Sequence, residues 1–254
     1  MARHYMYLTT LLVLAVIAMT PSLHACFDPM DTFSGEVLLN KPGITYDLSV
    51  LDGVEGVVKL DDNTYMYRSH VGEAVVIVYL EDLVNGVPVW GKQEPTSYCI
   101  GVRVELMNMS LDQATSVDDI MEYRENATLW LRNIMGYELE WLIGIGVIAG
   151  LEDSDIDSIL STLESGYAGW NSRLVYYSGD SRWHPYNELI RNNLIQGELL
   201  RGSSGCRWFI PRDKVPSEPP KATPTHSSAG APSSVVETET TSRVGGFDGL
   251  ALAI

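Results

Sequence analysis

The stretch AVVIVYL, residues 74–80, is a continuous run of apolar and mostly β-branched side chains. A run of this length without a polar position predicts a strand that is buried on both faces of a sheet. Residues 97–106 alternate instead: the even-numbered positions from Ile100 to Leu106 are apolar, and Cys99 belongs to the opposite face. The two stretches predict the middle of one sheet.

Turn residues divide the rest of this region into further short strands. Asp61-Asp62-Asn63 separates two β-rich stretches, and Asn85-Gly86 is a strong local signal for a hairpin. Because strands joined by such turns run antiparallel, we expect an N-terminal antiparallel sheet. The other stretches expected to form strands are residues 36–40, 44–50, 54–60 and 64–68.

After residue 116 the spacing of apolar residues becomes helical. Ser116 is a good N-cap, apolar side chains recur every three or four positions from Ile120 to Ile134, and Gly136 is a plausible stop. A block of strands followed by a block of helices predicts an α+β fold, with a helical segment packed on the sheet. The later elements that we expect are a buried helix over 138–149, a helix over 155–163 capped by Ser154, a strand over 174–177 and a short helix over 187–194.

The first 25 residues have the order of a secretory signal peptide. A charged start is followed by the apolar run 8–19 and by Ala25 before a cleavage point. An uncleaved membrane anchor is the alternative, but the run is shorter than the roughly 20 residues that a spanning helix needs. We therefore expect residues 1–25 to be removed on export.

Three segments follow the signal peptide. Residues 26–212 predict a single globular domain, which is long enough to bury a sizeable core. Residues 213–244 are dominated by Pro, Ser, Thr, Ala and Glu and predict a disordered stalk, either O-glycosylated or bare. Residues 245–254 form a short apolar C-terminal segment, too short to span a bilayer.

The chain has 3 cysteines, so one is left over from any pairing. Cys26 follows Leu23-His24-Ala25 and is a candidate for lipidation at the mature N-terminus. Cys99 and Cys206 are then the candidate disulfide, which would contribute about 4 kcal/mol by closing a long loop. If Cys26 is not lipidated, it can instead form the disulfide with Cys99 or with Cys206. The alternative to any disulfide is that the cysteines are buried free thiols.

The formal net charge of −16 excludes some classes of partner. Nucleic acid is a polyanion and would be repelled, and an acidic surface disfavours anionic lipid. We therefore expect no nucleic-acid partner, and contact with a membrane only through an anchor.

No pattern of catalytic or metal-ligating residues stands out. Acidic and hydroxyl side chains at 153, 155, 157, 161 and 164 have the spacing of a calcium loop, but Ser158 replaces the glycine of its sharp turn. The same residues fit a helix start better. His70 and His184 are isolated, and no Cys-x-x-Cys accompanies them, so we expect no metal site, no cofactor and no cysteine nucleophile.

Two surface features remain as candidates. Asn108-Met109-Ser110 and Asn126-Ala127-Thr128 are N-glycosylation sequons, of which the second lies inside the predicted helix. Aromatic side chains cluster late in the domain, where they either bind sugars or partner proteins or, as we favour, pack over the sheet. These aromatic residues are Trp170, Tyr176, Tyr177, Trp183 and Tyr186.

Three stretches together resemble a known family. They are ACFDPMD (25–31) with VLLNKPG (37–43), AGWNSRLVY (168–176), and the Pro/Ser/Thr-rich stalk. The chain resembles secreted cell-surface proteins of Thermococcus-like archaea, in which such a stalk ends in a Cys-Gly-Pro sorting signal. The resemblance implies secretion and surface anchoring and no established activity. In this chain residues 245–254 contain no Cys-Gly-Pro, so the sorting signal itself is not intact.

From these observations we expect an exported protein, extracellular or anchored at the cell surface, with a structural or binding role. Components of the cell envelope or surface glycans are the expected partners. The competing hypothesis is a secreted hydrolase that uses carboxylate chemistry, because acidic residues are plentiful.

Overall fold

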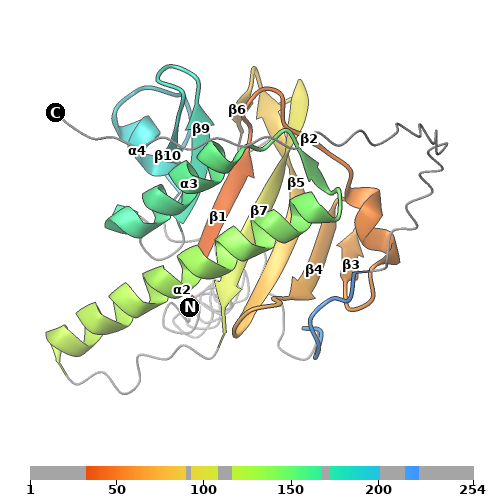
Figure 1. The fold of residues 1–254 in the computed structure, drawn as a ribbon. Coiled ribbons are helices and arrows are strands. Elements are labelled where there is room, and N and C mark those ends of the chain that lie inside the picture. Colours follow the sequence, from red (N-terminus) through yellow and green to blue (C-terminus); the bar gives the residue numbers. More distant parts are fainter. Residues whose placement is uncertain (1–32, 90–92, 108–115, 168–171, 201–214, 223–254) are drawn as a thin grey trace, which may run out of the picture. The chain divides into compact units, whose positions relative to one another are not determined.

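One mixed sheet organises the described part of the chain (Figure 1). The computed structural model describes residues 33–89, 93–107, 116–167, 172–200 and 215–222. The order of the main sheet is β10-β9-β1-β7-β5-β4-β3, and β6 pairs with β5. These strands are β1 (Phe33–Leu39), β3 (Val58–Asp61), β4 (Thr64–Arg68), β5 (Ala74–Val84), β6 (Val87–Pro88), β7 (Ser97–Leu106), β9 (Ser172–Tyr177) and β10 (Arg182–Pro185).

The α-helices follow the first seven strands in the sequence, so the α+β class is confirmed. Figure 1 shows the longest of them, α2, running across one face of the sheet. The remaining elements are α2 (Val117–Gly144), α3 (Asp153–Thr162), α4 (Tyr186–Arg191), the 3-10 helix η2 (Leu48–Gly53), the π turn η3 (Leu163–Tyr167) and a small sheet of β2 (Thr45–Tyr46) and β8 (Ile148–Ala149).

The predicted central strands lie at the centre of the sheet. β5 and β7 pair antiparallel from Ala74 with Leu106 to Leu83 with Ser97. Both faces of β5 are buried, as its continuous apolar run predicted. β1 lies on the other side of β7, and it pairs in parallel with β9 through Gly35–Leu38, which adds a parallel join to the otherwise antiparallel sheet.

The two faces of the sheet have separate cores. The helix face lies under α2 and α3 and holds the even-numbered apolar side chains of β5 and β7 together with Leu131 and Leu139 of α2. The rear face holds the odd-numbered side chains, including Cys99 of β7, and packs against Tyr186 and Leu189 of α4. The alternation read from residues 97–106 is confirmed.

The prediction that Gly136 stops a helix is wrong. α2 runs for 28 residues through this position, so residues 138–144 continue the same helix and no separate helix covers 138–149. The reason is packing between helices. A Cβ on Gly136 would lie 3.0 Å from Cδ1 of Leu160, so the glycine provides the space in which α3 packs on α2. The predicted cap by Ser116 is confirmed, and Asp119 completes a capping box.

Residues 44–50 do not form one strand, contrary to the prediction. Only Thr45 and Tyr46 are extended, and Asp47 then caps η2 by accepting a hydrogen bond from the backbone N of Ser49 at 3.0 Å. A short polar side chain that bonds to the backbone competes with strand pairing in this way. A similar correction applies to α3, whose N-cap is Glu152 rather than Ser154.

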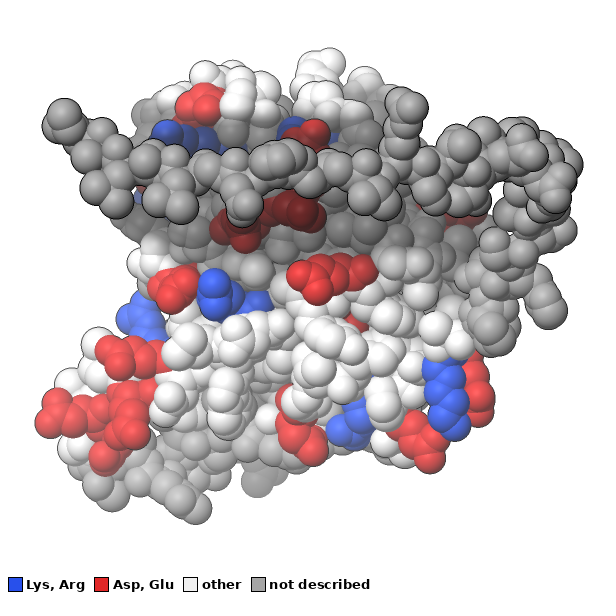
Figure 2. Space-filling view, in the orientation of Figure 1, with Lys and Arg blue, Asp and Glu red and all other residues white. Residues whose placement is uncertain are grey.

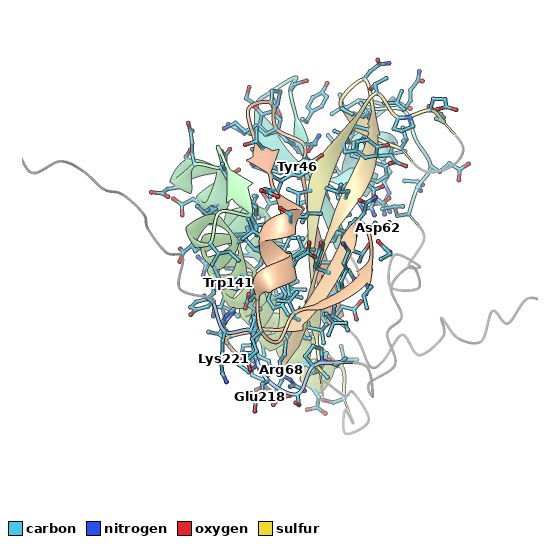
Figure 3. The ribbon with its side chains drawn as sticks, turned by 90° about the vertical axis from the view of Figure 1, so that its right-hand side faces the viewer. Tyr46, Asp62, Arg68, Trp141, Glu218 and Lys221 are labelled. Carbon is cyan, nitrogen blue, oxygen red and sulfur yellow. The ribbon has the colours of Figure 1, made fainter. Side chains whose placement is uncertain are left out.

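Residues 215–222, which the sequence places in the stalk, lie against the sheet edge. The carbonyl of Pro216 accepts a hydrogen bond from Nε of Arg68 at 3.0 Å, and the backbone N of Lys221 donates to the carbonyl of Glu55 at 2.8 Å. Pro220 is buried. Figure 3 shows Arg68, Glu218 and Lys221 together at one end of the sheet. We call residues 215–222 the strap.

The close contact between Tyr79 and Gly101 gives a first prediction. A Cβ on Gly101 would overlap the ring of Tyr79, which lies across from it on the neighbouring strand. Gly101→Ala should therefore lower the free energy of unfolding by about 2–4 kcal/mol, through overpacking and the loss of a Tyr79 hydrogen bond. Chemical denaturation measures this change.

Gly144→Ala is the matched control, because the space around Gly144 at the end of α2 is open. This variant should be as stable as the wild type or up to about 1 kcal/mol more stable. Equal stability of the two variants would contradict the packing argument.

Candidate functional site

A groove of about 750 Å³ lies at the end of the sheet where β1, β5 and β9 end. One wall is the β5–β6 turn, residues 84–89, and the other is the segment 194–198 that follows α4. Asn40 and the end of β9 lie between them. Figure 1 shows β6 and α4 on the two sides of this end of the sheet. The groove therefore joins four separate segments of the chain.

The walls of the groove are positioned by local sequence signals. The β5–β6 turn has positive φ at Asn85 (54°) and Gly86 (77°), as the Asn-Gly signal predicted. On the other side, the side chain of Asn187 in α4 donates to the carbonyl of Leu200 and accepts from its backbone N, both at 2.8 Å. This pair of bonds holds the segment after α4 in place.

Asn40 connects these parts. Its Nδ2 donates to the carbonyl of Tyr176 at 3.0 Å and to that of Gly86 at 3.4 Å, and its Oδ1 accepts from the backbone N of Tyr176 at 2.7 Å. The backbone pairing of β1 and β9 ends at Leu38 and Val175. Beyond that point the side chain of Asn40 takes the place of a backbone partner for Tyr176. The floor of the groove is thus fixed by one amide.

The chemistry of the lining is polar but almost uncharged. Amide and hydroxyl groups of Asn85, Gln93, Gln196 and Ser178 alternate with tyrosine and aliphatic side chains. Among the described residues of the lining, Glu198 is the one acidic side chain, and none is Lys or Arg. An uncharged ligand that offers both hydroxyl groups and apolar surface fits such a lining.

A cluster of acidic and basic side chains lies on the rear face of the sheet. Nε of Arg173 in β9 is 2.6 Å from Oε2 of Glu36 in β1, and its Nη1 is 3.6 Å from Glu81 in β5. The hydroxyl of Tyr79 donates to the other oxygen of Glu36. Arg103 pairs with Glu105 at 2.7 Å along β7. We call these residues the rear-face ion network.

The environment of Glu36 keeps this carboxyl ionised. Burial raises its pKa, but the charges of Arg173 and Arg103 and the hydrogen bonds outweigh burial, so that the pKa lies below its ordinary value. Burial raises the pKa of Glu105, against the effect of Arg103. None of these side chains lines the groove, so the network fixes strands rather than meeting a ligand.

A second polar cluster joins α2 to the β4–β5 connection. Glu138 is fully buried and accepts hydrogen bonds from Oγ of Ser69 at 2.7 Å and from the backbone N of His70 at 3.0 Å, while Nδ1 of His70 lies 3.4 Å away. Serine, histidine and glutamate are the residue types of a hydrolytic triad. Here both Ser69 and His70 bond to the carboxylate, rather than Ser69 to His70, so the arrangement lacks an activated nucleophile.

The candidate modification residues are only partly within the described chain. Cys99 is buried on the rear face, and burial raises the pKa of its thiol well above the ordinary value. Cys26, Cys206 and Asn108 lie outside the described residues. The lipidation, the Cys99–Cys206 disulfide and glycosylation at Asn108 therefore stay predictions. Asn126 is exposed on α2.

The acidic residues after position 152 form the helix start, not a calcium loop. Residues 153–162 are helical as α3. Asp155 is buried and accepts from Nζ of Lys41 at 2.8 and 2.9 Å, and Nε1 of Trp183 lies 3.5 Å away. This carboxylate joins α3 to the sheet and is not available as a ligand.

Two residues of the aromatic cluster are buried, as favoured from the sequence. Trp183 and Tyr186 are buried, and the rings of Tyr176 and Trp183 meet edge to face at 5.5 Å. His184 pairs with Asp180 at 2.8 Å on the surface. Tyr176 and Tyr177 in addition line the groove, whereas Trp170 lies outside the described residues. Sequence reasoning missed the other groove residues, because only the Asn85-Gly86 turn carried a local signal.

Comparison with known proteins gives one family. The model of the CGP-CTERM domain protein family matches residues 23–99 and 96–254, which together cover most of the chain. No curated protein and no solved structure matches the chain. In the described part of the chain, none of the helices combines the length and apolar character that crossing a bilayer requires.

The rear-face ion network gives a second prediction. Arg173→Met leaves Glu36 buried without its main counter-charge and should lower the free energy of unfolding by about 3–5 kcal/mol at pH 7. In the wild type the folded pKa of Glu36 lies below its unfolded value, so its contribution is full above the unfolded pKa and is lost as the pH falls through the folded pKa.

In Arg173→Met, burial instead places the pKa of Glu36 above the unfolded value, so acidification relieves the buried charge. The deficit relative to the wild type should therefore shrink from pH 7 towards pH 4 in urea denaturation. The double variant Glu36→Leu/Arg173→Met should regain part of the lost stability, because it removes the carboxylate of Glu36 as well, while Glu81 still loses Arg173. A deficit that does not change with pH would show that the pair is not ionic.

Proposed function

Since the chain belongs to the CGP-CTERM domain protein family, we propose that it is an exported protein, held at the cell surface, whose groove binds uncharged saccharides of the cell envelope. Membership of a family named for a C-terminal sorting signal supports secretion or surface anchoring. The signal peptide read from residues 1–25 supports export independently. The resemblance of residues 25–43 and 168–176 to proteins of Thermococcus-like archaea points to an archaeal envelope.

The observation that carries the binding function is the uncharged lining of the groove. Pyranose rings offer hydroxyl groups to amides such as Gln93 and Gln196 and offer C–H surface to Tyr177. Among the described residues of the lining, an anionic ligand would meet no basic side chain, and a cationic ligand would meet Glu198 alone. The chemistry therefore favours a neutral chain of sugars.

The same lining favours binding over hydrolysis. Glycosidases place two carboxyl groups on opposite sides of the scissile bond, about 5–9.5 Å apart. Among the described residues, Glu198 is the one carboxylate of the groove. Ser69, His70 and Glu138 adjoin the opposite end of β5, away from the turn at residues 84–89. A secreted hydrolase remains the second candidate only if bound saccharide is consumed.

The strap lies away from the groove. The strap bonds to Arg68, which pairs with Val75 at the start of β5, whereas the groove lies beyond Val84 at its end. Nine residues of strand separate these ends by about 30 Å. The strap and the groove therefore lie at opposite ends of β5.

Titration with neutral oligosaccharides tests this function. The exported chain is titrated calorimetrically with gluco-, manno- and galacto-oligomers, and with uronic-acid oligomers as the charged comparison. We expect binding of at least one neutral series and none of the charged one. Tyr177→Ala should weaken that binding at least about tenfold, or 1.4 kcal/mol, because it removes an aromatic surface of the groove.

Tyr98→Ala is the matched control, since Tyr98 is exposed on β7 and does not line the groove. Its affinity should equal that of the wild type. Absence of binding to every neutral series, or equal loss in both variants, would refute the proposal. Shortened products after incubation would establish the hydrolase instead.

A further inference from the structure

Aromatic side chains form a stripe along one flank of α2, where Tyr123 and Trp141 pack against the core and Trp130 and Tyr137 are exposed. Tyr123, Trp130 and Tyr137 are seven residues apart, and Trp141 follows four residues later. This spacing places the four rings on one side of the helix over about 27 Å. Trp130 is 55% exposed and Tyr137 is 44% exposed. We call these four residues the aromatic stripe.

One end of the aromatic stripe is fixed by the cluster around Glu138. The ring of His70 lies 4.5 Å from that of Trp141 and 5.9 Å from that of Tyr137, measured between centroids. The other end, from Tyr123 to Trp130, has exposed positions around it. Large exposed aromatic surfaces on soluble proteins usually mark a site that something covers.

The charges around the stripe argue against a second copy of this chain as its cover. Figure 2 shows largely uncharged side chains over the middle of α2 and acidic ones gathered at its start. Asp118, Asp119, Glu122 and Glu125 supply these carboxylates. Two such helices packed in parallel would bring their acidic ends together and repel each other. Packed antiparallel, they would place each acidic end against uncharged surface, with no electrostatic attraction.

An attachment point for another cover lies within the stripe. Asn126 is exposed, with Tyr123 three residues before it, Leu129 three residues after it and Trp130 four residues after it. Residues at these offsets are neighbours on a helix surface, with Cβ atoms about 5–6 Å apart. Asn126-Ala127-Thr128 is an N-glycosylation sequon. A sugar on Asn126 would thus begin against Leu129 and Trp130, both of which are exposed.

We infer that Asn126 carries an N-linked glycan that lies along the aromatic stripe and covers Trp130. The inference rests on the export in the proposed function, not on the groove. In the modification, the amide nitrogen of Asn126 attacks the anomeric carbon of an oligosaccharide carried on a lipid phosphate. The C–N bond forms, the bond from the anomeric carbon to the phosphate oxygen breaks, the lipid phosphate leaves, and the amide nitrogen loses one proton.

The folded helix sets the timing of this step. Thr128 is buried, and its hydroxyl donates to the carbonyl of Arg124 at 2.8 Å. A transferase that reads the threonine of the sequon cannot reach it in this state. The glycan is therefore added while the chain emerges and before α2 packs on the sheet, after which the sugar can settle on the exposed rings.

Peptide mapping by mass spectrometry tests the inference on the full chain recovered from outside the cells that make it. The peptide containing Asn126 should carry a glycan mass, and Asn126→Gln should remove it. Asn133→Gln is the matched control, because Asn133 lies on the same side of α2 without a sequon. Hydroxyl-radical footprinting then measures how far the glycan shields Trp130 from solvent. Oxidation of Trp130 should be severalfold higher in Asn126→Gln than in the wild type, while oxidation of Tyr98 on β7 stays constant.

Each outcome decides the inference. An unmodified Asn126 on exported protein overturns it and leaves the groove untouched. A glycan that is present without protecting Trp130 overturns the covering role. Oligosaccharide titration of Asn126→Gln separates the two proposals: unchanged affinity is expected, whereas loss of groove binding in this variant would show that the stripe and the groove act as one site.

Discussion

The rest of the structure depends on the buried ion pair between Glu36 and Arg173. Within the described residues, β9, β10 and α4 join the main sheet through the parallel pairing of Gly35–Leu38 with β9. A guanidinium and a carboxylate 2.6 Å apart fix that pairing, and Tyr79 of β5 bonds to the same carboxylate. The pair thus links three strands, and it holds one wall of the groove against the other.

Such a pair is a costly means of attachment, since each charge leaves water. What it provides is specificity. An apolar strand could slide along β1 by two residues and still bury its side chains, whereas Arg173 meets Glu36 in one register only. Asn40 favours the same register of β1 and β9 at the end of these strands, because its amide bonds to both the backbone N and the carbonyl of Tyr176. Register is therefore set twice, by charge inside the sheet and by an amide at the groove.

The sequence predicted those features that local patterns encode. The continuous run at 74–80, the alternation at 97–106, the Asn85-Gly86 turn and the Ser116 cap each depend on neighbouring residues, and each is confirmed. Features that depend on distant partners were not predictable. Alternation alone would turn Glu36 and Arg173 towards solvent, and Gly136 reads as a stop until Leu160 packs on it. The groove draws its lining from four separate segments, so no single stretch of sequence carried its signal.

The surfaces that we assign to different tasks occupy different elements. The groove lies beyond the end of β5, the strap bonds at its start, and the aromatic stripe follows one flank of α2. A chain anchored through its stalk could therefore carry a glycan on α2 without blocking the groove. The strap bonds to Arg68 and Glu55 near β3 and β4, while the register of β1 and β9 is held by the ion pair on the other side of β5 and β7. The contacts of the strap and the Glu36–Arg173 pair are thus separated by β5 and β7, which pair with each other over ten positions.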